Sequence, residues 1–586
     1  MAQITGYNSI KIGIDFGTTY SGIAWAHTST PEEINRNRTS AKAPSEISYG
    51  PSGVKWGFGI PSREPRLAWF KLLLDPSKYS LDNATNSPLT KTKQMIPIGK
   101  RPVNVVADYL SELHKHTIDH LVKALGKEVV EVSPLDFILT VPAVWSDAAK
   151  NLTLQAAELA GFGRKSSLRL ISEPEAAAVS CLRDIEPNHL QVGDTFVVAD
   201  CGGGTVDVIS YTITKKSPLE VVECVKGTGG MCGSTVLNER FEDLVRRRIG
   251  NRFDKMKPEG RIHMMKQFND ILKPGFTDSE DEDIFTCSIP GVADDADAGI
   301  EDGFFVIDRE DMRKIFDPVV QKVIQLVQQQ VKEVEKLPAN APLSGGEWLH
   351  IDTLSRIILS RQTRQVKALV LVGGFGESEY LRCRLEAEIR TKDGKKIIIL
   401  QPPNAWTAVV RGAVIRGLEG EMVLTRMVTK HYGIECDEPF IEGLHPKRDA
   451  YTDPFTGEDM CGRRMRWFIH RGQSVRESDP IRSTFIVDKG SIEELDNKFN
   501  FALLASESVS PSDTSSSPDV YTVCDLEVDL SKVPKDKFKK KIAINGQPVY
   551  RLTFDLLISI QSATLVFEFD VDGKVYNDVK ACYNYL

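Results

Sequence analysis

The spacing of apolar positions changes near residue 425. Before that point, apolar runs of strand length alternate with long amphipathic segments, which is the pattern of an α/β fold. Phe137–Val141 predicts a buried strand, and the residues after it predict a helix from an N-cap at Ser146 to an end at Gly161. Asp317 and Pro318 predict the start of a further helix. Its apolar positions repeat along one face that we expect to be buried, namely Val320, Ile324, Val327, Val331 and Val334.

From about residue 430 the pattern becomes that of short strands. Met465–Ile469 and Leu565–Phe569 alternate as strands do, and Asp572-Gly573 is a hairpin signal. The serine-rich stretch from Ser506 to Pro518 predicts a long flexible loop. We therefore expect a β-rich domain in the last third of the chain.

One pattern occurs twice. Ile12–Thr19 resembles Val197–Thr205, and in each copy an apolar strand reaches an aspartate (Asp15 or Asp200) and is followed by a Gly/Thr turn and a second strand. The long distance between the copies indicates a duplicated lobe rather than a short-period repeat.

These turns have the composition of a phosphate site. Glycine lets the backbone turn and approach an anion with its N–H groups, and threonine hydroxyls add donors. An aspartate beside them offers oxygen to Mg²⁺, which needs only one or two carboxylates beside the phosphates. A single segment of this kind is more often an ordinary hairpin, but two copies facing each other predict a clamp for a triphosphate.

A third glycine segment follows the apolar run Ala368–Val372. Gly373, Gly374 and Phe375 would leave backbone exposed for close contact with a flat nucleoside. A strand-to-helix turn is the alternative. Beside the two hairpins, we favour the ligand interpretation.

Composition excludes several classes of function. The net charge of -8 over 586 residues argues against a general nucleic-acid or acidic-membrane surface. Met1–Ile10 lacks the features of a secretory signal, and the apolar runs are too short to span a membrane. The ten cysteines have no paired spacing, which indicates reduced thiols in the cytoplasm or nucleus and argues against a zinc site.

Several motifs occur in the order found in the seventy-kilodalton heat-shock family, and together they cover residues 10 to about 420. They are Ile14–Ser21, Ile171–Ala178, Asp200–Asp207, Val372–Gly374 and Arg411–Val414. The chain resembles a divergent branch of that family. The resemblance implies an α/β, two-lobed actin-like fold (duplicated, ribonuclease H-like) over residues 1–425, with lobes at about 1–195 and 196–425. Residues 426–586 would form a smaller β-rich domain.

The resemblance also implies roles for individual residues. Asp15 and Asp200 would hold Mg²⁺ through water, Glu173 would order the attacking water, and Lys71 would stabilise charge at the γ-phosphate of ATP. An exposed helix lysine is the alternative for Lys71. The expected catalytic residues are Lys71, Glu173, Asp200 and Thr205. The expected ATP/ADP-binding residues are Asp15, Gly17, Thr18, Thr19, Gly202, Gly203, Gly204, Thr205, Asp270, Lys273, Gly373, Gly374 and Phe375.

The chain also departs from the family pattern. Glu175 stands where the family carries threonine, Pro274 where an arginine stacks on adenine, and Glu377 where another pocket arginine lies. The family's acidic-and-leucine linker, helical lid and acidic tail are not found, so the β-rich domain resembles a remnant of the substrate domain.

Three hypotheses follow. The preferred one is a chaperone-like protein of the cytoplasm or nucleus that hydrolyses ATP slowly with Mg²⁺. Its nucleotide state would control the binding of protein clients or partners through the β-rich domain, with co-chaperones as further partners and neither nucleic acid nor membrane as a ligand. The second hypothesis is an ATP-sensing scaffold with negligible hydrolysis. The third, a metabolite kinase of the same fold, is disfavoured because no aspartate base is evident in a sugar-binding segment.

Overall fold

The computed structural model describes most of the chain. The described residues are 9–36, 42–51, 53–75, 88–163, 167–184, 190–216, 219–281, 283–338, 363–420, 422–490, 498–577 and 579–583. Those up to Val423 form one unit, and those from Leu424 onward form another.

The first half of the first unit is built on a mixed sheet with the strand order β3-β2-β1-β8-β9, in which β4 also pairs with β2. β1 and β2 form an antiparallel hairpin, whereas β8 pairs in parallel with both β1 and β9. These strands are β1 (Ile10–Phe16), β2 (Tyr20–His27), β3 (Asn35–Arg36), β4 (Ala43–Pro44), β8 (Leu135–Val141) and β9 (Leu168–Ser172). The strand predicted at Phe137–Val141 is therefore confirmed as β8.

The second half repeats this arrangement. Five strands of its sheet follow the order β12-β11-β10-β17-β18, with an antiparallel β10–β11 hairpin and a parallel β10–β17 pair. The strands are β10 (Thr195–Cys201), β11 (Val206–Lys216), β12 (Leu219–Glu223), β17 (Val366–Val372) and β18 (Ile398–Leu400), and β13 (Thr228–Gly230) pairs with β11. The same strand order in both halves confirms the predicted duplication.

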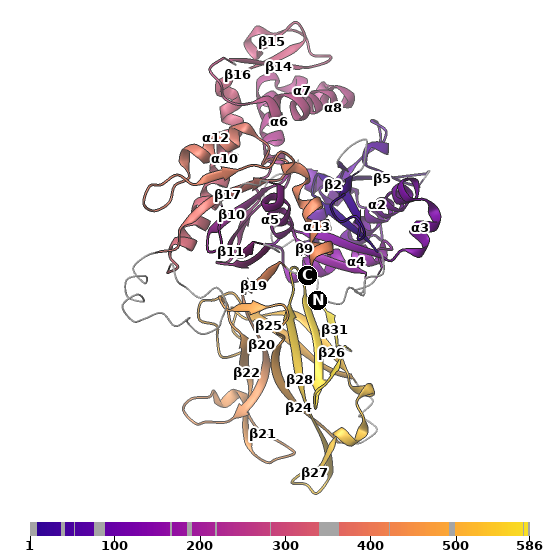
Figure 1. Ribbon diagram of the computed structural model, residues 1–586, viewed down its shortest axis with the longest axis vertical. Coiled ribbons are helices and arrows are strands. Elements are labelled where there is room, and N and C mark those ends of the chain that lie inside the picture. Colours follow the sequence, from indigo (N-terminus) through magenta and orange to yellow (C-terminus); the bar gives the residue numbers. More distant parts are fainter. Residues whose placement is uncertain are drawn as a thin grey trace. The chain divides into compact units, whose positions relative to one another are not determined.

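The last helix of each half packs on the sheet of the other half. α5 (Glu173–Asp184) contacts β10 and β11 (Figure 1), whereas α13 (Ala408–Glu419) contacts β1 and β8. The two helices cross where Gly412 meets Ala176, since a Cβ added to Gly412 would lie 1.6 Å from the Ala176 carbonyl oxygen. Only glycine allows this approach. The crossing joins the halves and fixes where the ends of their central strands lie.

The remaining elements of the first unit cover these sheets or extend from them. In the first half they are β5 (Glu46–Gly50), β6 (Gly53–Trp56), β7 (Leu67–Ala68), α1 (Pro88–Met95), α2 (Pro102–Leu125), α3 (Lys127–Val132) and α4 (Asp147–Leu159). In the second half they are α6 (Thr235–Ile249), α7 (Asn251–Lys255), α8 (Pro258–Gln267), α9 (Lys273–Gly275), β14 (Ile284–Ser288), β15 (Ile300–Glu301), β16 (Phe304–Asp308), α10 (Arg309–Glu335) and α12 (Glu379–Glu388). The Ser146 hydroxyl oxygen accepts from the Ala149 N–H at 3.2 Å, so the N-cap predicted for α4 is confirmed.

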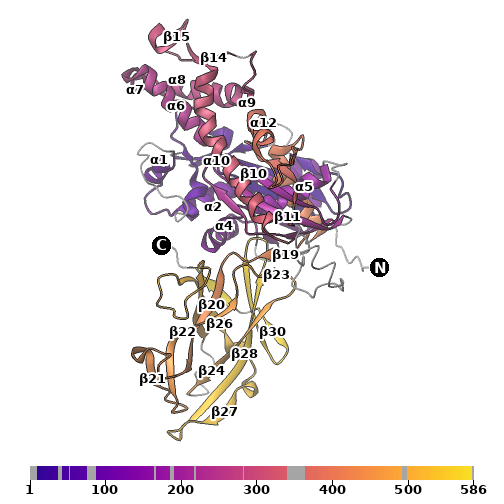
Figure 2. The same cartoon turned by 90° about the vertical axis from the view of Figure 1, so that its left-hand side faces the viewer.

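The helix predicted to start at Asp317 begins instead at Arg309, where the Asp308 carboxylate caps it by accepting from the Asp311 N–H at 2.7 Å. Figure 2 shows α10 running from β16 toward β10 and β11. Pro318 therefore lies inside the helix and cannot donate to the carbonyl of Lys314. The Arg240 side chain donates to that carbonyl at 2.7 Å, which compensates for the missing bond. The predicted apolar face is buried as expected.

The second unit is built from two antiparallel sheets, with the orders β21-β22-β20-β25-β26-β31 and β24-β28-β29-β30. Its strands include β20 (His431–Pro439), β21 (Ala450–Thr452), β22 (Asp459–Ile469), β24 (Ile481–Lys489), β25 (Lys498–Ser506), β26 (Tyr521–Asp529), β28 (Pro548–Ile560), β29 (Leu565–Val571), β30 (Lys574–Tyr576) and β31 (Val579–Cys582). Three others are β19 (Val423–Met427), which pairs with β23 (Ser474–Arg476), and β27 (Lys539–Ile542), which pairs with β28.

The hairpin predicted at Asp572-Gly573 joins β29 to β30, and both residues have positive φ, as such a tight turn requires. The serine-rich loop follows β25. Its Ser512 carbonyl accepts from the Trp467 indole N–H at 3.0 Å, and its Asp513 carbonyl accepts from the Met465 N–H at 3.0 Å. The loop is thus attached to β22.

Candidate functional site

A cavity of about 440 Å³ opens between the two halves of the first unit. Every site residue predicted from the sequence lines it: Asp15, Gly17, Thr18, Thr19, Lys71, Glu173, Asp200, Gly202, Gly203, Gly204, Thr205, Asp270, Lys273, Gly373, Gly374 and Phe375. The structure thus brings the predicted residues together. Their roles stay predictions.

The two Gly/Thr turns face each other across this cavity. A Cβ added to Gly203 would lie 2.1 Å from the Thr19 hydroxyl oxygen, and one added to Gly204 would lie 2.8 Å from the Thr18 methyl group. The threonine side chains therefore already occupy the space that a side chain at either glycine would need, and glycine lets the two turns come into direct contact. Such facing backbone turns can hold a chain of phosphates from both sides.

Lys71 and Glu173 form a buried ion pair at the floor of the cavity. The Lys71 ammonium donates to Glu173 Oε1 at 2.7 Å, and the Lys71 side chain is 2% exposed. Lys71 lies in a short 3-10 helix, Phe70–Leu74, and its Nζ is 5.2 Å from the centre of the Trp145 ring. The alternative of an exposed helix lysine is therefore wrong.

Asp15 is held by two neighbours. Its carboxylate forms an ion pair with Lys42, whose side chain is 8% exposed, and it accepts a hydrogen bond from the Thr140 hydroxyl at 3.2 Å. Sequence reasoning missed Lys42. The residues around it carry no motif, and burial of a lysine is not visible in a single sequence.

Negative charge accumulates in this part of the cavity. Burial, with the nearby carboxylates Glu173, Asp207 and Asp15, raises the pKa of Asp200 well above its usual range. Burial also raises the pKa of Glu173, although Lys71 opposes the shift. The pKa of Asp207 is raised to about 7, again mainly by burial. A cation beside these carboxylates would favour their charged forms and lower their pKa.

The donor set fits a hydrated Mg²⁺. The described residues contain no group of three or more histidine, cysteine, aspartate or glutamate side chains close enough to hold a metal directly. Mg²⁺ usually keeps several waters and takes one or two carboxylates together with phosphate oxygens. Asp15 and Asp200, next to the two turns, provide such a pair.

The other end of the cavity is more exposed. It is formed by the end of a short π-helical segment, Phe268–Leu272, and by α9, with Asp270 and Pro274 both exposed. Burial lowers the pKa of Lys273 to about 8, with Asp270 opposing the shift. The Lys273 ammonium donates to the side-chain oxygens of Asn269 at 2.7 Å and Asn238 at 3.0 Å. These polar contacts fix its position.

Three further residues bound this end. The exposed Glu377 accepts a hydrogen bond from the Trp406 backbone N–H at 2.9 Å. The Trp406 ring meets the Tyr20 ring edge-on, with centroids 5.7 Å apart, and so spans the two halves of the unit. The cavity therefore has an aromatic rim.

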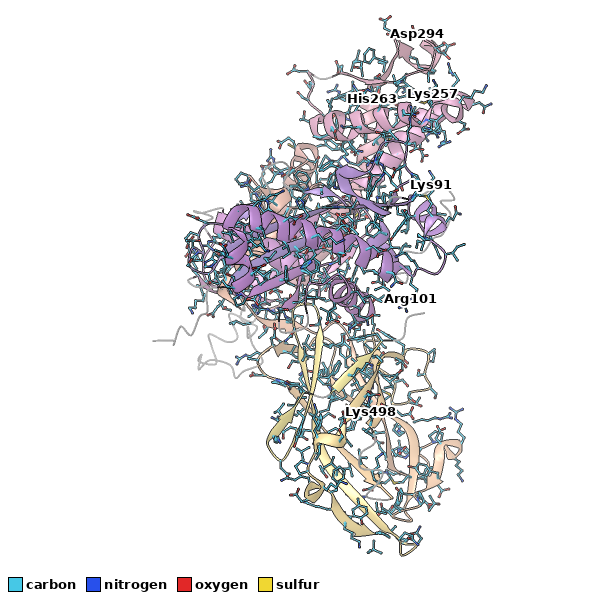
Figure 3. All side chains as sticks on the ribbon, turned by 90° about the vertical axis from the view of Figure 1, so that its right-hand side faces the viewer. Lys91, Arg101, Lys257, His263, Asp294 and Lys498 are labelled. Carbon is cyan, nitrogen blue, oxygen red and sulfur yellow. The ribbon has the colours of Figure 1, made fainter. Side chains whose placement is uncertain are left out.

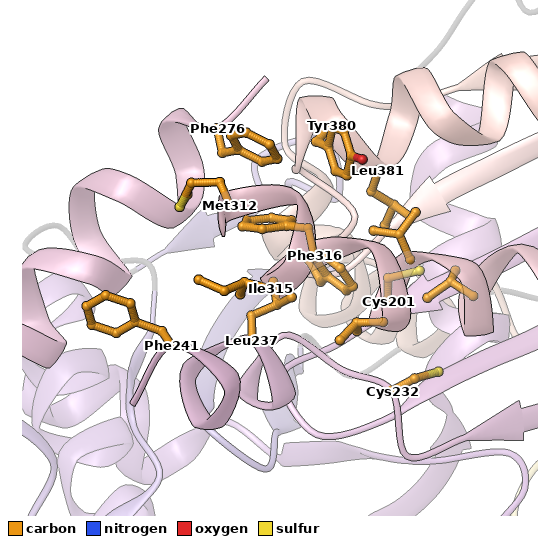
Figure 4. Packing of buried hydrophobic residues seen from close by; sticks show 14 of the residues in the cluster. Cys201, Cys232, Leu237, Phe241, Phe276, Met312, Ile315, Phe316, Tyr380 and Leu381 are labelled. Carbon is orange, nitrogen blue, oxygen red and sulfur yellow. The ribbon is translucent and has the colours of Figure 1, made fainter. Parts of the chain in front are cut away.

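An aromatic cluster packs next to the exposed end of the cavity. Phe276, which follows α9, packs against Phe316 and Tyr380 with ring centroids 4.8 Å apart in each pair (Figure 4). Cys201 and Cys232 belong to the same hydrophobic cluster, and burial raises the pKa of both thiols. This environment indicates that both cysteines serve in packing.

The departure at Glu175 lies at the helix crossing. Glu175 is fully buried, and its carboxylate lies 3.4 Å from the Arg416 guanidinium of α13. The carboxylate therefore links the helices through which the two halves meet.

Several lining residues were not predicted from the sequence: Tyr20, Lys42, Ser234, Asn269, Phe316, Ser378, Trp406 and Val409. Tyr20 belongs to the first Gly/Thr motif and could have been included on that ground. Trp406 and Phe316 lie outside the motifs recognised in the sequence, so their place at the cavity follows from the tertiary fold.

Both parts of the chain are similar to known proteins. A family model described as Hsp70 protein matches residues 82–338, and one described as a domain of unknown function matches residues 426–583. Heat shock 70 kDa protein 12B of Homo sapiens is 24% identical over 571 residues, covering 81% of this chain and 78% of the relative. Heat shock 70 kDa protein 12A of Mus musculus is 22% identical, covering 82% of this chain and 80% of the relative.

A bacterial chaperone is also similar. Chaperone protein HscA homolog of Burkholderia multivorans is 24% identical over 471 residues, covering 77% of this chain and 66% of the relative. Within the described residues, no helix combines the length and the apolar character that crossing a membrane requires.

Proposed function

Because this chain belongs to a divergent branch of the seventy-kilodalton heat-shock protein family, we propose that it binds ATP and Mg²⁺ in the cavity of the first unit and hydrolyses ATP slowly. The family assignment supports a nucleotide-binding, chaperone-like protein. The observation that carries the finer proposal is the pair of facing Gly/Thr turns beside buried Asp15, Glu173 and Asp200.

The phosphate chain would lie between the two turns. Thr18, Thr19 and the Gly202–Thr205 turn would donate hydrogen bonds to phosphate oxygens. Asp15 and Asp200 would hold Mg²⁺ through its water shell, and the ion would neutralise charge on the phosphates. At the other end, Asp270, Lys273 and the Gly373–Phe375 backbone would contact the nucleoside.

Lys71 and Glu173 would act on hydrolysis itself. The Lys71 ammonium is held in place by Glu173, so it can stabilise developing negative charge without first reorganising. Glu173 is the carboxylate nearest to that cation and would orient the attacking water. Because Lys71 is buried, its charge acts in a medium of low dielectric constant, where it has a larger effect than at the surface.

The second unit would bind protein partners in response to the nucleotide state of the first. We propose that it is a remnant of the family's substrate domain and that it binds protein clients or partners according to the nucleotide state, with co-chaperones assisting. Its separation from the nucleotide-binding unit at Val423 and its antiparallel sheets support this assignment. Strand addition to a sheet edge is one mode open to such a unit.

A two-part assay tests the proposal on the full chain. Titration calorimetry should detect Mg·ATP binding, and Asp200→Asn should weaken it at least tenfold because it removes a charge beside the metal and phosphates. Single-turnover phosphate release should be faster than in Thr205→Ala. Absence of Mg·ATP binding would reject the proposal, whereas binding with release no faster than the Thr205→Ala control would favour an ATP-sensing scaffold.

A further inference from the structure

Lys42 reaches the centre of the cavity by a specific strand pairing. β4 pairs with the start of β2, with Ala43 opposite Ser21, and Lys42 directly precedes β4, so one further step in the same register would set it opposite Gly22. Gly22 is in turn paired with Asp15 of β1. Since Gly22 has no side chain, the row from Lys42 to Asp15 contains no bulky group. The hairpin that carries the first Gly/Thr turn therefore also places Lys42 beside Asp15.

Lys42 is buried and ion-paired, unlike an ordinary surface lysine. Its Nζ forms the ion pair with Asp15, and the two side chains are 8% and 7% exposed. The Nζ also lies 5.9 Å from the centre of the Trp406 ring, which bounds the cavity from the other half of the unit. The positive charge of Lys42 also opposes, to a small extent, the rise in pKa that burial causes at Glu173 and Asp200.

The balance of charges in the cavity indicates a role for Lys42. Asp15, Glu173, Asp200 and Asp207 are buried carboxylates, and Lys71 is engaged by Glu173. A nucleoside triphosphate adds further negative charge, so entry of the phosphates requires cations already present or brought with the ligand. Lys42 presents an ammonium group at Asp15, which is one of the two carboxylates proposed for Mg²⁺. Lysine is a common phosphate ligand that acts as a compact point charge.

We propose that Lys42 is a built-in phosphate-binding cation that lets the cavity hold the phosphate chain of ATP or ADP in the absence of Mg²⁺. The inference rests on the proposed function, because it concerns the same cavity. Asp15 holds the ammonium near the first turn until nucleotide enters, and the phosphate oxygens then share it. Mg²⁺ adds to this binding without being a condition for it.

The test measures nucleotide affinity rather than activity. ATP and ADP are titrated into the full-length protein by calorimetry, once with Mg²⁺ and once with EDTA. For the wild type, we expect replacement of Mg²⁺ by EDTA to weaken binding by less than about tenfold, because one ammonium charge remains at the phosphates. In EDTA, Lys42→Met should bind nucleotide at least a further tenfold more weakly than the wild type. Lys42→Arg keeps the charge and should lose less affinity.

Lys91→Met is the matched control, because Lys91 is an exposed lysine on α1, away from the cavity lining (Figure 3). It should behave as the wild type in both buffers. Binding of Mg·ATP by Lys42→Met would show that the variant is folded. Its loss of nucleotide affinity in EDTA could then be assigned to the missing ammonium group.

Two results would overturn the inference while leaving the proposed function intact. One is wild-type binding that is strong with Mg²⁺ and absent in EDTA. The other is a Lys42→Met variant that binds Mg·ATP more tightly than the wild type and is unchanged in EDTA, which would mean that Lys42 only competes with Mg²⁺ for Asp15. Absence of binding by the wild type in both buffers would reject the proposed function, and this inference with it.

Discussion

The two ends of the cavity differ in how firmly their side chains are held. At the phosphate end, Lys71, Lys42 and their carboxylate partners are buried and ion-paired at the ends of central strands. At the nucleoside end, Lys273 is held by hydrogen bonds to two asparagines, but Asp270 of the π-helical segment, Pro274 of α9 and Glu377 are exposed. Buried, oriented charges act strongly, whereas exposed ones are screened. We therefore expect contacts with the phosphates to contribute most of the free energy of nucleotide binding. Contacts with the base should discriminate little between one nucleotide and another.

The largest effect should come from the buried cation at the phosphate end. Lys71→Met removes the charge proposed to stabilise the transition state and leaves Glu173 without its partner. We expect single-turnover hydrolysis to fall roughly a hundredfold to a thousandfold, as for loss of a comparable electrostatic group. Lys91→Met is the exposed control. Equal rates in Lys71→Met and the wild type would remove Lys71 from the mechanism.

At the nucleoside end, an added stacking surface should produce a gain. Pro274→Arg supplies a planar guanidinium at the exposed rim, and stacking on a base contributes about 1–3 kcal/mol. We expect roughly tenfold tighter binding of ATP and GTP alike, because stacking does not distinguish the bases. The control Pro274→Ala should bind as the wild type does. If both variants bind equally, the base does not lie near residue 274.

A change of pH should have a smaller effect on ATP affinity. Because the pKa of Lys273 is lowered to about 8, its ammonium is charged below that pH and neutral above it. An anionic nucleotide favours the charged form, so ATP affinity should fall as pH rises from 7 to 9, by roughly threefold to fivefold. Lys273→Arg stays charged over this range and should flatten the profile. A profile that keeps its slope in Lys273→Arg would assign the titration to another group.

The smallest effect should come from Glu377. Glu377→Gln keeps an acceptor for the Trp406 N–H but removes an exposed negative charge from the rim. Because exposed charges are screened, we expect ATP affinity to rise by less than about twofold. A change of tenfold or more by calorimetry would show that this end of the cavity contributes far more than its exposure suggests.

Local sequence predicted the parts of the fold that local chemistry determines. The two Asp–Gly/Thr hairpins, the Ser146 cap and the Asp572-Gly573 turn depend on neighbouring residues and were found as predicted. The start of α10 was not, because Pro318 lies inside the helix, where Arg240, which lies far away in sequence, donates to the carbonyl left without a backbone partner. The sequence shows the proline but not the distant donor.

The candidate site divides in the same way. Its glycines, threonines and aspartates lie in motifs that could be recognised, and they line one cavity. Lys42 could not be found, because its position beside Asp15 depends on the pairing of β4 with β2. Trp406 likewise reaches Tyr20 only when the two halves of the unit are assembled. Contacts between distant segments leave no local pattern in a single sequence.

The most direct test of the contrast between the two ends is competition against labelled Mg·ATP by its separate parts. Inorganic tripolyphosphate, with Mg²⁺, should displace ATP with an inhibition constant within about tenfold of the ATP dissociation constant, because the buried charges remain satisfied. Adenosine should be at least about a hundredfold weaker, since it reaches only the exposed end. Displacement by adenosine at ATP-like concentrations, with none by tripolyphosphate, would contradict the account.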